Sequence, residues 1–169
     1  MATSVILRIR LADIEPDIWR LFSVPTGYTL AGLHFIIQAV MGWEDEHLHL
    51  FNIDGERYGV PADASEGWSI SEEANVRLSH VLKEDKTFLY VYDFGDNWRH
   101  EITVQSMVNE PLPLRCLGGE YACPPEDSGG PFAYPDLVDA ILSPETADPE
   151  ILEWVGDCPS SYKLEQSAA

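Results

Sequence analysis

Basic residues are scarce in this sequence. Ten Lys and Arg stand against 29 Asp and Glu, which gives a formal net charge of −19. Affinity for duplex nucleic acid comes largely from Lys and Arg contacts to phosphates, and anionic membranes attract basic segments. The composition therefore argues against direct binding to either. It leaves open a cationic partner, a metal cation, an acidic protein that mimics DNA, or a charge that serves only solubility.

Long apolar runs and a dense set of cysteines are also missing. No run of about 18 apolar residues exists, so we expect no membrane-spanning helix, and the N-terminal MATSVILRIRL lacks the pattern of a signal peptide. The three cysteines, Cys116, Cys123 and Cys158, do not form a disulfide framework. We therefore expect a cytoplasmic protein in which Cys116 and Cys123 form a pair, bind a metal with a histidine or pack as free thiols.

The hydrophobic pattern of residues 1–108 predicts strands and one long helix. Apolar and polar residues alternate over residues 5–11, as in a half-buried strand, and residues 18–24 form a second strand. Thr29 is a typical helix N-cap and Gly42 a typical stop, and an apolar stripe runs between them over residues 30–41. Further strands are expected at residues 47–53, 56–60, 87–93 and 98–108.

This order of elements predicts an α+β fold. We expect one domain of residues 1–169, with a mixed or antiparallel sheet and the long helix packed on one face, and a β-grasp-like arrangement is one option. The Pro-rich part, residues 109–159, is expected to hold an irregular segment over residues 111–133. Two short helices would follow, one from Pro135 and one N-capped by Asp148. Residues 160–169 would form a frayed tail.

Three histidines and an aspartate predict a metal site. His47 and His49 are two apart on an expected strand, so both imidazoles would project from one face. His100 lies on another expected strand, and Asp96 lies in the turn before it. Imidazole and carboxylate together suit zinc, manganese or iron, and a metal-bound water would make the protein a metal-dependent hydrolase. The alternative is that these histidines are core residues held by hydrogen bonds.

Aromatic, acidic and glycine residues gather in two segments, YDFGDNWRH (residues 92–100) and CPPEDSGGP (residues 123–131). Loops often carry binding residues, and aromatic side chains commonly line ligand sites. We therefore expect a non-enzymatic module that binds a protein or a small ligand at a surface combining both segments. The candidate binding residues are Trp19, His34, Gln38, Tyr92, Asp93, Asp96, Trp98, Glu126, Asp127 and Tyr134.

Several motifs, in order along nearly the whole chain, resemble those of the plasmid pRiA4b ORF-3-like family. They are IWR (18–20), LHFIIQAVMGW (33–43), HLHLF (47–51), YDFGDNWRH (92–100) and CLGGEYACPPEDSGGP (116–131). The resemblance implies a compact α+β domain from a plasmid or mobile element, and it implies no activity. Some members carry a TnpR-type label, but a resolvase needs an arginine-rich phosphate pocket, and the arginines here are widely spaced. Ser128 stands where the family pattern has a cysteine, so a cluster with Cys116 and Cys123 would be incomplete.

Overall fold

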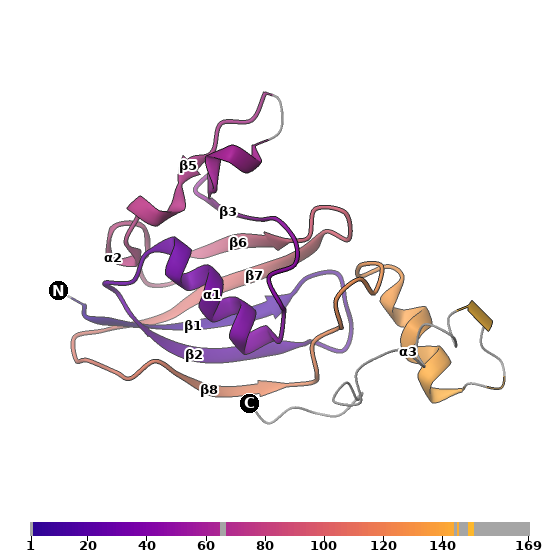
Figure 1. Cartoon of the computed structure of the whole chain (residues 1–169). Coiled ribbons are helices and arrows are strands. Elements are labelled where there is room, and N and C mark those ends of the chain that lie inside the picture. The colour runs from indigo at the N-terminus through magenta and orange to yellow at the C-terminus, as the bar shows by residue number, and fades with distance from the viewer. Residues whose placement is uncertain (1, 65–66, 144, 146–148, 151–169) are drawn as a thin grey trace.

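An eight-stranded sheet forms the body of the protein (Figure 1). The computed structural model describes residues 2–64, 67–143, 145 and 149–150. The strand order is β5-β4-β3-β6-β7-β1-β2-β8, and neighbours run antiparallel except β4 and β5, which are parallel. The fold is α+β, with a sheet wider than a β-grasp-like arrangement. The strands are β1 (Ser4–Leu11), β2 (Trp19–Pro25), β3 (His49–Ile53), β4 (Glu56–Gly59), β5 (Ser71–Glu72), β6 (Thr87–Tyr92), β7 (Trp98–Val108) and β8 (Arg115–Glu120).

The helix α1 (Leu30–Met41) lies across one face of this sheet (Figure 1). The Thr29 side chain accepts a hydrogen bond from the N–H of Gly32 and so caps the start of the helix. Gly42 ends it at a φ of +85°, where a side chain would be strained. The apolar stripe of α1 and the inward residues of β1 belong to one buried cluster, so the helix is held by the core.

Histidine and aromatic side chains are aligned across the middle strands. Directly opposed residues on neighbouring strands share a face, so the register places them in two adjacent rows. His34 of α1 hydrogen-bonds Tyr90 of β6, which shows that α1 covers this face. One row consists of His49, Tyr92 and Trp98, and the other of Phe51, Tyr90 and His100. All six of these side chains are buried.

Part of the segment expected to be irregular is a strand. Residues 115–120 form β8, which pairs with β2 at one edge of the sheet. The buried guanidinium of Arg20 secures this edge, because it donates to the carbonyl of Val40 at the end of α1 and to that of Glu120, each at 3.1 Å. The prolines that suggested irregular structure lie outside the paired residues, so the free edge of β2 could recruit this segment.

Short elements complete the described chain. The loop between β4 and β6 contains η1 (Pro61–Asp63), η2 (Glu73–Asn75) and α2 (Leu78–Val81). The helix α3 (Tyr134–Leu142) begins one residue before the expected start. Of the second expected helix, only residues 149–150 are described, and the expected tail at 160–169 lies outside the described residues.

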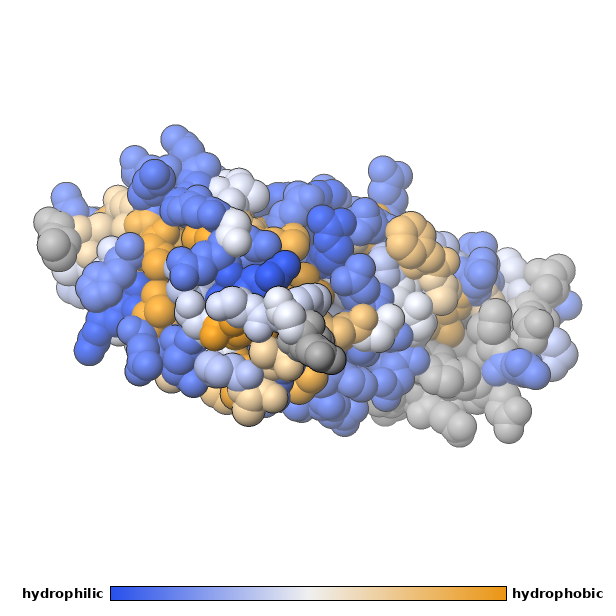
Figure 2. All heavy atoms as spheres, turned by 90° about the horizontal axis from the view of Figure 1, so that it is seen from above, coloured by the Kyte–Doolittle hydropathy of each residue, from blue (hydrophilic) through white to orange (hydrophobic). Residues whose placement is uncertain are grey.

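The surface carries few extended apolar areas on the side seen from above in Figure 2. Hydrophilic residues cover most of that face, and hydrophobic residues show in small patches (Figure 2). Among the described residues, no helix is long and apolar enough to cross a membrane.

Candidate functional site

The two segments YDFGDNWRH and CPPEDSGGP lie against each other at one end of the sheet. The carboxylate of Asp96 accepts a hydrogen bond from the N–H of Gly129 at 3.0 Å. Gly130 approaches so closely that a Cβ added there would lie 2.4 Å from the backbone oxygen of Asp96. This contact requires glycine, and it fixes Glu126 and Asp127 beside the turn that follows β6.

The imidazole of His47 sits among three carboxylates from these segments. Its Nε2 lies 2.8 Å from Asp127 Oδ1, 3.5 Å from Asp93 Oδ2 and 3.7 Å from Glu126 Oε2. Asp127 is largely exposed, whereas the Asp93 and Glu126 side chains are about nine-tenths buried, at 9% and 11% exposure. The cluster is therefore closed on the protein side and open to solvent on the other.

In each of the two buried carboxylates, Asp93 and Glu126, one oxygen accepts hydrogen bonds from the described part of the chain and the other does not. Asp93 Oδ1 accepts from the N–H groups of Gly95 and Asp96 in the turn. Glu126 Oε1 accepts from the Tyr92 hydroxyl at 2.8 Å and from the Glu44 N–H at 2.9 Å. Glu126 Oε2 is buried and has no hydrogen-bond partner among the described residues. Such outer partners orient carboxylates for a bound cation.

The crowding of carboxylates shifts the pKa values of the groups in the cluster. Partial burial lowers the pKa of His47, but the Asp93, Asp127 and Glu126 carboxylates outweigh this and raise it. Burial raises the pKa of Glu126. Burial, together with the Glu126 carboxylate, also raises the pKa of the Tyr92 hydroxyl, so Tyr92 remains a donor. The site thus holds more negative charge than one imidazolium neutralises.

The spacing of these ligand atoms fits a coordination shell. Around a metal with bonds of about 2.0–2.2 Å, neighbouring ligand atoms lie roughly 3.0–3.6 Å apart. The 2.8, 3.5 and 3.7 Å separations from His47 Nε2 bracket that range. The ligand atoms of His47, Asp93 and Asp127 lie within 4.8 Å of one another, and so do those of Glu46, His47 and Glu126. A metal held by all four groups would require Glu126 to move closer to the two aspartates.

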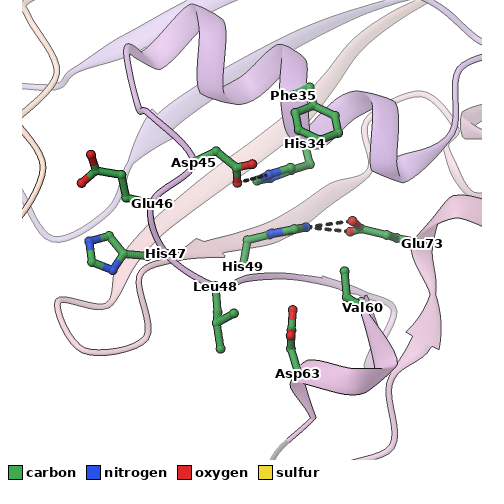
Figure 3. Close-up of a pocket in the computed structure, with 10 residues that line it drawn as sticks. All are labelled: His34, Phe35, Asp45, Glu46, His47, Leu48, His49, Val60, Asp63 and Glu73. Atoms are coloured by element: carbon green, nitrogen blue, oxygen red, sulfur yellow. Dashed lines mark hydrogen bonds and ion pairs between the residues drawn. The ribbon is translucent and has the colours of Figure 1, made fainter.

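A second cluster, around His34 and His49, has a different geometry (Figure 3). The two imidazole rings stack with their centroids 3.4 Å apart and an interplanar angle of 10°. A metal lies near the plane of an imidazole that binds it, at about 2.0–2.1 Å from the nitrogen. Two parallel rings at this separation share no such point, so His34, Asp45 and His49 do not form a metal site in this arrangement.

The expected metal set of His47, His49, Asp96 and His100 is not brought together. The strand β3 begins at His49, so His47 precedes it and turns to the other side (Figure 3). Both ring nitrogens of His100 are engaged, Nδ1 with the Tyr90 carbonyl and Nε2 with the indole N–H of Trp43. Burial lowers the pKa of His100 to about 4, so it is a neutral core residue.

Comparison with known proteins places this site in a family. The model of the plasmid pRiA4b ORF-3-like proteins matches residues 3–168. The chain belongs to that family. It is 34% identical over 164 residues to the uncharacterized protein y4hQ of Sinorhizobium fredii, covering 92% of this chain and 82% of the relative.

A crystal structure shares the fold. The protein of unknown function MM3350 from Methanosarcina mazei has a TM-score of 0.82 and 32% identity, covering 96% of this chain and 92% of that one. Neither description assigns a function, so membership in the family supplies no activity to compare with the site.

The remaining candidate binding residues lie apart from the cluster around His47. Trp98 and Tyr134 are buried against each other in the core, with ring centroids 6.3 Å apart. Trp19 lies on β2 under the guanidinium of Arg8, whose Cζ is 4.9 Å from the ring centroid. His34 and Gln38 join a buried hydrogen-bond network around Tyr90.

One partner at the site was not indicated by the sequence. Glu73, from the loop between β4 and β6, bonds His49 with both carboxylate oxygens at 2.9 Å. Cys116 and Cys123 are free thiols, and Cys116 donates weakly to the Leu21 and Gly118 carbonyls. Burial raises the pKa of the Cys123 thiol, which keeps it protonated.

Proposed function

We propose that this protein is a binding module for a divalent metal ion, held by His47, Asp93, Glu126 and Asp127. The observation that carries the proposal is the unpartnered Oε2 of Glu126, buried 3.7 Å from His47 Nε2 while Oε1 is held by two donors. A buried carboxylate oxygen without a partner is costly. A bound cation would remove that cost.

The ligand set narrows the class of metal. One imidazole with three carboxylates suits zinc, manganese or iron, whereas calcium and magnesium favour oxygen ligands alone. The three carboxylates carry a charge of −3, so a divalent ion with neutral His47 leaves the site at −1. Binding would expel a proton from His47 wherever its raised pKa keeps it protonated.

A metal-dependent hydrolase is the second candidate, and the exposed side of the cluster favours it. Asp127 is 63% exposed and His47 30%, so coordination positions facing solvent would be filled by water. A metal-bound water of lowered pKa is the nucleophile of such enzymes. Turnover of activated ester and phosphoester substrates by the metal-loaded chain, lost in His47→Ala, would establish this activity.

Metal titration of chain prepared without a histidine tag tests the binding proposal. After dialysis against chelator, calorimetric titration with zinc and with manganese is expected to give one ion per chain. His47→Ala and Glu126→Gln are each expected to weaken binding at least tenfold. His80→Ala removes an exposed histidine of α2 and serves as the matched control. Binding below one ion per chain, or unaltered binding in His47→Ala, would overturn the proposal.

A further inference from the structure

A hollow of about 490 Å³ lies beside the proposed metal site around His47, on the other side of the connector between α1 and β3 (Figure 3). The stacked rings of His34 and His49 form its floor, and Glu46 and His47 border it toward the proposed metal site. Its volume falls within the roughly 300–1,000 Å³ of small-molecule sites. The size therefore suits a compact organic ligand.

The floor of the hollow is a closed ring of hydrogen bonds. Gln38 Nε2 donates to the Tyr90 hydroxyl, which donates to His34 Nδ1. His34 Nε2 donates to Asp45 Oδ1, and the Asp45 N–H donates back to Gln38 Oε1. Only this direction uses the single proton of Tyr90 once and leaves His34 neutral. Burial, and the nearby His49, lower the pKa of His34, which agrees with a neutral ring.

Negative charge borders the hollow without a matching cation. Four carboxylates line it, from Asp45, Glu46, Asp63 and Glu73, and neither Lys nor Arg does. Asp45 and Glu73 are engaged by the two histidines of the floor. The carboxylates of Glu46 and Asp63 accept no hydrogen bond from any residue that the structure describes. These two groups are available to a ligand.

Apolar side chains gather around the same hollow. Eight large hydrophobic side chains are exposed in the described part of the chain, and three of them line this space. Phe35 is 61% exposed, Leu48 45% and Val60 37%. Exposed apolar groups concentrated at one concave place mark a binding site more strongly than groups scattered singly. The ligand should therefore carry an apolar part as well as a charge.

We propose that the hollow binds a small organic cation, a primary amine or guanidinium with a short apolar chain. The cationic head would contact the Asp63 carboxylate, which points toward His49 inside the hollow (Figure 3). The chain would contact Phe35, Leu48 and Val60. Anionic and neutral ligands of the same shape would lack these charge interactions. This inference does not depend on metal binding, because Asp63 belongs to none of the candidate metal groups among the described residues.

Titration with isosteric probes tests the inference. Pentylamine, butylguanidine, 1-pentanol and pentanoate are added to chelator-treated full-length chain, and NMR shifts of Phe35, Leu48 and the histidine rings are followed. The two cations are expected to shift these signals and to bind at least tenfold more tightly than 1-pentanol, with no binding of pentanoate.

Charge-removing variants separate a built site from general attraction to an acidic protein. Asp63→Asn is expected to weaken pentylamine binding at least fivefold. Asp85→Asn removes the same charge from an exposed position before β6 and should leave binding unchanged. Equal binding of pentylamine and 1-pentanol, or equal losses in Asp63→Asn and Asp85→Asn, would overturn the inference. Loss of metal binding in Glu126→Gln with amine binding intact would show that the two sites are separate.

Discussion

Replacing Gly130 with alanine tests whether the docking of residues 92–100 against residues 123–131 builds the proposed metal site. Gly130 has a φ of +88°, and a Cβ there would lie 2.4 Å from the backbone oxygen of Asp96. The positive φ costs a non-glycine residue about 1–2 kcal/mol. Because backbone cannot yield as a flexible side chain does, overpacking adds about 1–3 kcal/mol. Gly130→Ala should therefore lower the free energy of unfolding, or of loop docking, by about 2–5 kcal/mol.

Gly55→Ala is the matched control for this change. Gly55 has a φ of +83° and nothing within 4 Å of an added Cβ, so alanine there carries the conformational cost without the clash. The difference between the two variants in urea denaturation isolates the contact with Asp96.

Metal titration gives the second readout for the same pair of variants. Gly130→Ala should bind zinc or manganese at least tenfold more weakly, because the displaced loop carries Glu126 and Asp127, whereas Gly55→Ala should bind as the parent chain does. Equal stability and equal affinity in the two variants would refute the reasoning.

Three further outcomes are expected. Metal affinity should fall as pH is lowered through the raised pKa of His47, since protons compete for Nε2; titrations between about pH 8 and pH 6 check this, and a pH-independent affinity would contradict it. His100, with a pKa of about 4 when buried and about 6.5 when unfolded, stays unprotonated in the native chain while the unfolded chain takes up a proton. The stability it contributes should be complete above about pH 6.5 and fall by roughly 3 kcal/mol as pH drops toward 4. Urea denaturation across this range, compared with a His100→Gln variant that lacks the slope, measures it. Tyr90→Phe should cost about 1–3 kcal/mol, because His34 Nδ1 and Gln38 Nε2 lose their partner. Tyr58→Phe, whose hydroxyl bonds the exposed Glu56, should cost less in thermal unfolding, and an equal loss would argue against the network.

Elements bounded by local chemistry could be predicted from the sequence. The helix α1 begins after the Thr29 cap and ends before Gly42, and β7 has the bounds that its alternation indicated. These signals are short-range, because capping and strand alternation involve residues a few positions apart. The strand β8 was missed because its pairing depends on the free edge of β2, which lies 90 or more residues earlier.

Short-range sequence signals do not predict which side chains surround His47 and His49. The alternation of HLHLF extends to His47, but pairing with β6 begins at His49 opposite Tyr92. Alternation alone does not locate the first paired residue, and the chain at Asp45 has a φ of +54° that no strand contains. The partners of these histidines, Asp127 and Glu73, lie 80 and 24 residues away. Their meeting is a property of the tertiary fold.

The two ends of the sheet bear on self-association. An unpaired strand edge offers N–H and C=O groups to any extended chain, and long flat edges promote edge-to-edge aggregation. Here one edge strand, β5, has only two residues. The other, β8, has a register irregularity opposite β2 and lies between Pro113 and Pro124, which donate no backbone hydrogen bond. The two prolines thus limit strand addition to the ten residues between them, of which six form β8.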